Sequence, residues 1–209
     1  MPDDKSVTLG NDGIYLDAAV LYADLADSTD MVNSMGAVYA AEVYKTFLTC
    51  AARIINREGG TITAYDGDRI MAVFIGDSKN SDAARTALRI NWAVSEIIRP
   101  AWAAQYTSSL YSLRHVVGVD ISRLLVAKTG VRGANDLVWV GRAANYAAKM
   151  CALDDVHSSY ITSAAYNQLN DASKFHTVEG VKNNMWTLQR ETIKGEPVYA
   201  SNYLWRDTG

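Results

Sequence analysis

The sequence is poor in the residues that hold small disulfide-bonded or zinc-binding domains together. It has 2 Cys, 3 His and 3 Pro among 209 residues. Cys50 and Cys151 lie far apart in apolar helical patterns, and neither has a second Cys or His at metal-ligand spacing. The pattern therefore argues against a disulfide framework and a zinc enzyme, and it favours two reduced core thiols.

An excess of positive charge and a long hydrophobic run are also lacking. The formal net charge is −3, so the chain has no global basic field for holding a long nucleic acid. No apolar run approaches the roughly 20 residues that a membrane helix needs. We therefore expect a cytoplasmic protein without direct nucleic-acid or membrane binding, in which a local site could still hold a small anion.

Hydrophobic residues, in contrast, make up 49% of the chain, which suits one compact core. We expect a polar N-terminal segment over residues 1–13 and one domain over residues 14–209. The patterns predict an α+β, ferredoxin-like βαββαβ sheet with an extended edge and tail. The expected strands cover residues 18–23, two runs within 61–74, 113–121, a hairpin over 124–140, and 186–203. The expected helices cover residues 31–57, 82–98 before Pro100, 145–153 and 163–169.

Two carboxylates stand at strand ends, where burial calls for a partner. Asp24 follows the apolar run VLYA, and Asp68 lies in the hairpin before IMAVF. If the two strands are neighbours, these carboxylates repel each other unless cations lie between them, and oxygen ligands of this kind suit Mg²⁺ or Mn²⁺. The following residues Leu25, Ala26, Asp27, Ser28 and Thr29 lead into a helix whose backbone N–H groups could cradle phosphates. The pattern alone reaches a metal-dependent phosphoryl or nucleotidyl transfer site, while a turn or cap role for each Asp stays open.

Three motifs then narrow this interpretation. VLYADLADST has Tyr22, Asp24 and Thr29 where class III adenylyl and guanylyl cyclases have Phe-x-Asp and a Thr five residues later. YDGDRIMAVF resembles their second metal motif, and VGRAANYAAKM resembles their Gly-x-x-x-Asn-x-x-x-Arg segment, with Lys149 in the place of the Arg. The resemblance covers about residues 18–203 in the family's motif order.

This resemblance implies a head-to-tail homodimer with active sites between the protomers. Asp24, Asp68 and the backbone carbonyl of Leu25 would bind two ions, Mg²⁺ or Mn²⁺. Asn145 and Lys149 of the other subunit would orient the ribose and stabilise charge at the transferring phosphorus. The ribose 3′-hydroxyl would attack the α-phosphorus and release pyrophosphate. Lysine cannot form the planar bidentate contact of arginine, which leaves the role of Lys149 open.

The base pocket departs from the purine cyclases, whose two polar readers are replaced by Ala64 and Val138. Neither side chain can form a hydrogen bond. Polar and aromatic residues nearby could read a smaller base instead, although Tyr65 also fits a core position and Arg132 a solvated one: Tyr65, Arg132, Asp136 and Trp139. A cyclase domain with this pocket resembles the bacterial pyrimidine cyclases of Pycsar antiphage systems, whose cyclic UMP or cyclic CMP acts on a separate effector protein. We expect a uridylate cyclase that converts UTP to 3′,5′-cyclic UMP.

Several alternatives stay open at this stage. They are a cytidylate cyclase using CTP, an adenylate or guanylate cyclase, and a degenerate non-enzymatic domain that senses nucleotides. A diguanylate cyclase shares the expected core, but its Gly-Gly-Asp/Glu-Glu-Phe hairpin is replaced by Asp66-Gly67-Asp68. That class would also leave the segment around Asn145 unexplained.

Overall fold

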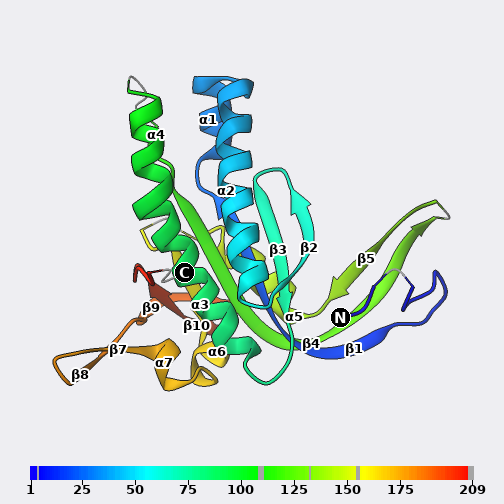
Figure 1. Cartoon of the computed structure of the whole chain (residues 1–209). Helices are drawn as coiled ribbons and strands as arrows, with labels where there is room; N and C mark the ends of the chain where they lie inside the picture. The colour runs from blue at the N-terminus through cyan, green and yellow to red at the C-terminus, as the bar shows by residue number, and fades with distance from the viewer. Residues whose placement is uncertain (4, 108–110, 132, 154–155, 207–209) are drawn as a thin grey trace.

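An eight-stranded sheet organises the fold (Figure 1). The computed structural model describes the whole chain except residues 4, 108–110, 132, 154–155 and 207–209. The strand order is β2-β3-β1-β4-β6-β10-β9, and β5 pairs with the far half of β4. The strands of this sheet are β1 Ile14–Leu25, β2 Thr61–Asp66, β3 Arg69–Phe74, β4 His115–Val131, β5 Ala134–Val140, β6 Ser159–Thr162, β9 Thr187–Ile193 and β10 Glu196–Ser201. A separate hairpin pairs β7 Phe175–Val178 with β8 Val181–Asn184.

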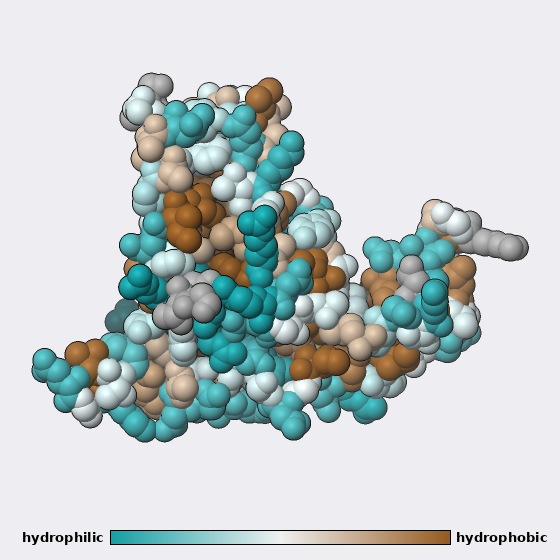
Figure 2. All heavy atoms as spheres, viewed as in Figure 1, coloured by the Kyte–Doolittle hydropathy of each residue, from teal (hydrophilic) through white to brown (hydrophobic). Residues whose placement is uncertain are grey.

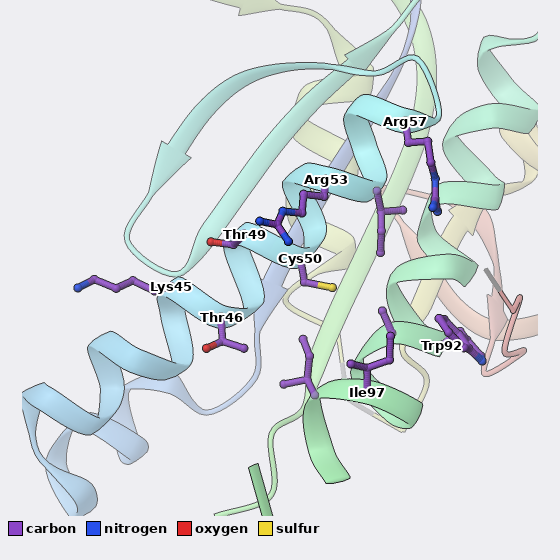
Figure 3. A pocket seen from close by; sticks show the side chains of 11 residues that line it. Lys45, Thr46, Thr49, Cys50, Arg53, Arg57, Trp92 and Ile97 are labelled. Atoms are coloured by element: carbon purple, nitrogen blue, oxygen red, sulfur yellow. The ribbon is translucent and has the colours of Figure 1, made fainter. Parts of the chain in front are cut away.

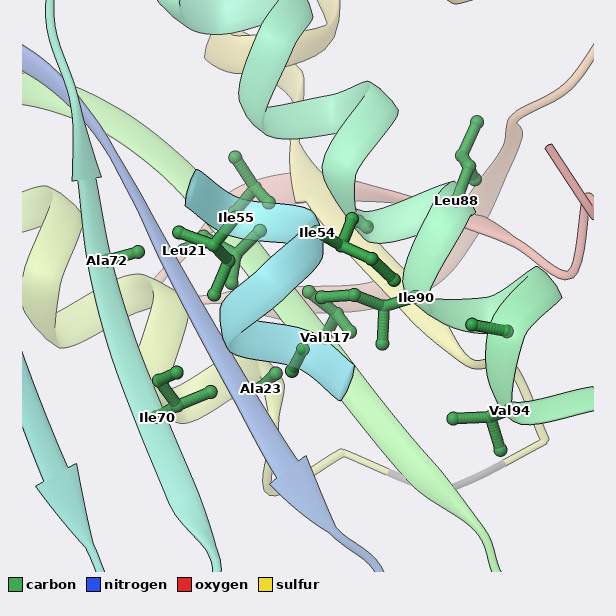
Figure 4. Packing of buried hydrophobic residues seen from close by; sticks show 14 of the residues in the cluster. Leu21, Ala23, Ile54, Ile55, Ile70, Ala72, Leu88, Ile90, Val94 and Val117 are labelled. Carbon is green, nitrogen blue, oxygen red and sulfur yellow. The ribbon is translucent and has the colours of Figure 1, made fainter. Parts of the chain in front are cut away.

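The helices divide between the two faces of the sheet. They are α1 Ser28–Met35, α2 Ala37–Arg57, α3 Lys79–Ala93, α4 Arg99–Gln105, α5 Arg142–Met150, α6 Ser163–Asn167 and α7 Asp171–Lys174. Figure 4 shows Ile54 and Ile55 of α2 with Leu88 and Ile90 of α3 around the strands. On the other face, α5 packs through Ala143 and Ala147. Within the described residues, no helix combines the length and the apolar character needed to cross a bilayer.

The predicted ferredoxin-like core is confirmed. Its first four strands lie in the order β2-β3-β1-β4 with antiparallel neighbours, as a βαββαβ chain requires. Alternation along β1 explains why both faces are covered, because Ala19, Leu21 and Ala23 face α2 and α3 while Ala18 and Val20 face α5. The first strand, β1, begins at Ile14, and the expected domain bounds stay a prediction.

Two predicted helices have different bounds in the structure. The predicted helix over 31–57 is two helices, because Gly36 adopts φ 85° and ψ 163° between them. The predicted helix over 82–98 begins earlier, at Lys79, and does not end before Pro100. It continues through a π-helical turn, Val94–Ile98, into α4. Pro100 lies in the first turn of α4, where a helix tolerates a residue without a backbone N–H.

The C-terminal third contains elements that the patterns did not predict. The short strand β6, the turn-like α7 and the β7–β8 hairpin were missed. The predicted closing strands are confirmed as β9 and β10, which a tight turn joins at Lys194 and Gly195, both with positive φ. The predicted helix over 145–153 is α5, which has the same length but begins and ends three residues earlier, and the predicted helix over 163–169 is α6, which begins at the predicted residue and ends two residues earlier.

His115 makes folding stability depend on pH. The imidazole is buried beside Phe47, its two ring nitrogens have no hydrogen-bond partner, and burial, with Arg99 nearby, lowers its pKa to about 3. The unfolded chain binds a proton near pH 6.5 while the folded ring stays neutral, so stability is present above that pH and is lost as pH falls below it. We expect His115→Phe to remove about 2 kcal/mol of the stability difference between pH 7 and pH 5. Urea unfolding at both pH values measures this difference. If the unfolding free energy changed by the same amount between pH 7 and pH 5 in the wild type and in the variant, the prediction would be contradicted.

Candidate active site at the end of β1

The two carboxylates lie at one edge of the sheet. Asp24 is the residue before the last of β1, and Asp68 forms the β2–β3 turn with Gly67. Ala23 pairs with Ile70, so β1 carries Asp24 toward the turn that holds Asp68. The negative charge of Asp68 raises the pKa of Asp24, although burial of Asp24 is the larger cause of that rise. The structure therefore brings together the two carboxylates that the motifs predicted.

A cation already faces Asp24. The guanidinium of Arg69 places Nε at 3.1 Å and Nη2 at 3.0 Å from Oδ2 of Asp24, and this pairing lowers the pKa of Asp24 against the effect of burial. Asp68 is partly buried, and its Oδ2 has no hydrogen-bond partner. An unpartnered carboxylate oxygen beside a second carboxylate fits a hard divalent ion. No group of three or more Asp, Glu, His or Cys suited to a metal occurs among the described residues, and two carboxylates plus substrate phosphates are what Mg²⁺ commonly takes.

The turn after Asp24 leads into a helix N-terminus, as predicted. Leu25 pairs with His115, the N–H of Ala26 donates to the carbonyl of Arg114, and Asp27 adopts a left-handed conformation. Ser28 and Thr29 begin α1, whose N-terminus receives no side-chain cap in the described structure. The guanidinium of Arg114 pairs with the carboxylate of Asp27 across this turn. The turn thus has uncapped amides at the start of α1, as an anion cradle would need, and the cation beside them is paired with Asp27.

Asn145 and Lys149 lie on a different element. Both are exposed and one turn apart on α5, so their side chains share a face of that helix. The amide nitrogen of Asn145 donates to the carbonyl of Gly141 at 3.4 Å. Within the described chain, neither residue bonds to Asp24 or Asp68. Their exposure leaves both side chains available to a second protomer.

The base-pocket candidates divide between the two faces of the sheet. Ala64 is opposite Met71, on the face that α5 covers, whereas Tyr65 is opposite Ile70, on the face that α2 covers. Tyr65 is 57% exposed, so it is not a core residue, and it lies across the sheet from Asp24. One protomer therefore does not bring Tyr65 together with the carboxylates.

The β4–β5 hairpin carries the remaining candidates. Val138 pairs with Ala127 and is 38% exposed, while Trp139 is partly buried and packs against the cluster that includes Ala143 and Ala147 of α5. The carboxylate of Asp136 accepts a hydrogen bond from the N–H of Leu137. Arg132 lies outside the described residues.

Curated relatives match almost the whole chain. A protein of Xanthomonas perforans named uridylate cyclase is 53% identical over 99% of this chain and 88% of its own length. A uridylate cyclase of Burkholderia cepacia is 53% identical over 90% of this chain and 80% of its own, and one of Rhodovulum is 34% identical over 100% and 88%. The chain belongs to the class III nucleotide cyclases. No family model matches it.

Solved cyclase structures share the fold. The adenylyl cyclase CyaB from P. aeruginosa superposes with a TM-score of 0.76 at 18% identity, over 95% of this chain and 100% of that one. The guanylyl cyclase Cya2 gives a TM-score of 0.73 at 16% identity, over 94% and 96%. The sheet and helices described above are therefore those of a class III cyclase domain, and the chain is a nucleotide cyclase.

The position of the cyclase helix α5 depends on close contact with β4. A Cβ added to Gly118 would overlap the carbonyl oxygen of Ala147 and lie 2.9 Å from the Cβ of Met150. Gly141, at the start of α5, is similarly crowded by Leu124 and the carbonyl of Arg123. Arg142 adds a polar anchor, because its Nη2 donates to the carbonyl of Ile121 at 3.0 Å.

We expect Gly118→Ala to displace α5. Because φ at Gly118 is not positive, alanine is tolerated by the backbone, and the expected loss comes from overpacking alone. The cost should be about 1–3 kcal/mol, or a fall in Tm of roughly 5 °C, together with a lower kcat. Thermal unfolding and steady-state kinetics check this. An unchanged Tm would mean that α5 does not pack on β4 as described.

Proposed function

We propose that this cyclase converts UTP to 3′,5′-cyclic UMP and pyrophosphate. The observation that carries the proposal is the apolar pair at the purine-reading positions, Ala64 and Val138, in a chain 53% identical to proteins named uridylate cyclase. A purine placed there would bury ring nitrogens and exocyclic groups without partners. A pyrimidine has fewer polar groups to satisfy.

Asp24, Asp68 and the carbonyl of Leu25 are the groups proposed to hold two Mg²⁺ or Mn²⁺ ions. Bound there, the ions supply a lowered pKa for the ribose 3′-hydroxyl and charge neutralisation for the leaving pyrophosphate. Both contacts of the Arg69 guanidinium go to Oδ2 of Asp24, so Oδ1 of that carboxylate would remain for an ion. The uncapped amides of Ser28 and Thr29 are positioned to bind phosphate oxygens, with Arg114 beside them.

We propose a head-to-tail homodimer, in which the α5 face of one protomer completes the site of the other. Asn145 would orient the ribose, and Lys149 would stabilise negative charge at the α-phosphorus as a point charge. The exposure of both side chains, and the absence of a hydrogen bond from either to Asp24 or Asp68 within the described chain, support this division of labour.

We also propose that the cyclic nucleotide is a second messenger of antiphage defence that acts on a separate effector protein in the cytoplasm. This part rests on the likeness to pyrimidine cyclases of Pycsar systems. The test is whether cyclic UMP accumulates in cells expressing the chain only after phage infection.

A competition among triphosphates tests the substrate. Purified protein receives Mn²⁺ and equal concentrations of UTP, CTP, ATP and GTP, and the cyclic products are identified by mass. We expect cyclic UMP to exceed cyclic AMP and cyclic GMP by roughly a hundredfold, because two unpaired polar groups cost on the order of 1–3 kcal/mol each.

The competing outcomes are distinguishable. Dominant cyclic CMP would make the protein a cytidylate cyclase, and dominant cyclic AMP or cyclic GMP would overturn the account of Ala64 and Val138. Absence of pyrophosphate release from every triphosphate would favour the nucleotide-sensing domain. A variant with Ala64→Lys and Val138→Asp should gain purine turnover and lose pyrimidine turnover, and both positions are exposed enough to accept the changes.

A further inference from the structure

A groove of about 770 Å³ lies between α2 and the segment that joins α3 to α4 (Figure 3). On the α2 side it is lined by Cys50 and Ile54, and on the other side by Trp92, Ile97 and Ile98. In Figure 2, hydrophobic residues are exposed between the upright columns of α2 and α4, with hydrophilic residues beside them. The groove is separate from the candidate active site, which lies on the β-sheet edge at Asp24.

The π-helical turn shapes the apolar wall of this groove. It runs from Val94 to Ile98, and it leaves Ile97 50% exposed while Ile98 is only 4% exposed. A π-turn inserts a residue into the helical repeat, so side chains that follow it are displaced from the buried face. An exposed isoleucine beside the partly buried Trp92 is an apolar surface that a second surface could cover.

The rim of the groove is basic. Lys45, Arg53 and Arg57 belong to one i, i+4 row of α2, and Cys50 and Ile54 belong to the next row, which forms the floor. None of the described residues lining the groove is acidic, although the chain carries a net charge of −3. Glu58, the acid next to Arg57, is instead bound to Arg85 at 2.5 Å and Arg89 at 3.1 Å.

We propose that this groove is the docking site for an acidic amphipathic helix of another protein. The basic row spans residues 45 to 57, which is about 18 Å or roughly three helical turns. A third helix lying between two others can place apolar side chains at i, i+3 and i+4 against Ile54, Trp92 and Ile97. Its carboxylates then meet Lys45 and Arg53, which gives the orientation and disfavours basic helices.

The helix that a docked partner would contact, α2, is connected in sequence to both elements that carry the proposed metal ligands. α2 follows α1 and the turn after Asp24, and its other end leads into β2 and the turn that holds Asp68. An occupant of the groove therefore contacts the longer of the two helices that connect β1, which carries Asp24, to the β2–β3 hairpin, which carries Asp68.

A binding experiment tests the proposal without using cyclase activity, so its result is independent of the UTP assignment. The probe is a fluorescein-labelled peptide of about four helical turns with Leu on one face and Glu on the other, and the matched control peptide has Lys in place of Glu. Fluorescence anisotropy with the full chain should detect binding of the acidic peptide and not of the basic one. Arg53→Glu should weaken binding about tenfold, because a rim attraction becomes a repulsion.

Two controls locate the site. Arg190→Glu removes an exposed cation of β9 and should leave binding unchanged. Bound acidic peptide should also slow alkylation of Cys50, whereas Cys151, whose pKa is raised by burial to about 12, stays unreactive. Anisotropy and alkylation together separate groove binding from adventitious contact elsewhere.

Three outcomes would overturn the proposal. The first is equal binding of both peptides, or acidic-peptide binding that Arg53→Glu does not weaken. The second is sedimentation with phosphatidylglycerol vesicles that Arg53→Glu abolishes while the peptide does not bind, which would assign the groove to a membrane surface. The third is a protein oligomer in solution that Ile97→Ser dissociates, which would assign it to a second copy of the chain.

Discussion

Asp24→Asn should lower cyclase turnover on the order of 1,000-fold, which corresponds to about 4 kcal/mol of transition-state stabilisation. The substitution keeps the shape of the side chain and removes the charge that Mg²⁺ or Mn²⁺ requires. Asp68→Asn should have a similar effect, because Asp68, whose Oδ2 has no hydrogen-bond partner, is the other proposed metal ligand. Steady-state release of pyrophosphate from UTP measures both variants.

Folding should survive both substitutions. Burial raises the pKa of Asp24, and the charge of Asp68 raises it further, so an uncharged amide at position 24 relieves two unfavourable interactions while losing the pair with Arg69. The matched control is Asp17→Asn, an exposed carboxylate on the same strand. Titration with Mn²⁺, followed by electron paramagnetic resonance, should show weaker binding by Asp24→Asn and unchanged binding by Asp17→Asn. Wild-type turnover in Asp24→Asn would remove it from the proposed site.

The core and the carboxylate pair could be predicted because both depend on local patterns. Short apolar runs followed by Asp, and a Gly-containing two-residue turn between strands, have few structural solutions. Once β1 and β3 are neighbours, Asp24 and Asp68 must meet at one edge. The same locality explains the tight turn at Lys194 and Gly195, where both residues have positive φ.

The orientation of Tyr65 could not be predicted, because the register of β2 shifts between Ile62 and Ala64. Strict alternation would put Ile62 and Ala64 on one face, but the bulge moves Ala64 opposite Met71 and Tyr65 opposite Ile70. Nothing in the residue types of TITAYD signals the extra residue. Its consequence is that Tyr65 shares a face with α2 and not with Asp24.

The ion pairs of the site were missed for a different reason. Arg69 follows Asp68 directly, yet its partner Asp24 is 45 residues away, and Arg114 reaches Asp27 across 87 residues. Such pairs form only when the strand order brings distant residues together, and local sequence patterns do not show which distant residues become neighbours. The sequence offered one signal for an ion pair at the site: Arg69 is a cation directly after the suspected metal ligand Asp68.

Mixing two inactive variants should restore activity, because the proposed site takes its halves from different protomers. Asp24→Asn protein lacks a metal ligand, and Asn145→Ala protein lacks the ribose contact. A mixed dimer has one site with both defects and one with neither, so random exchange should yield about a quarter of wild-type turnover. Each variant alone stays near background. Native mass spectrometry verifies that the subunits have exchanged, and steady-state kinetics then measure the recovered turnover.

The placement of Asn145 makes the result of this mixing experiment interpretable. Asn145 is exposed on α5, and its side-chain hydrogen bond in the described structure goes to Gly141 just before that helix, so its loss should not disturb Asp24 of the same protomer. A mixture of Asp24→Asn with Asp68→Asn serves as the control, because both changes fall on the metal-binding half and every mixed dimer then carries one defect in each site. No recovery in the first mixture after verified exchange would place Asp24 and Asn145 in the same protomer's site. Recovery in the control would instead mean that Asp24 and Asp68 reach one site from different protomers. Recovery in the first mixture alone requires that α5 of one protomer works on the carboxylates of the other.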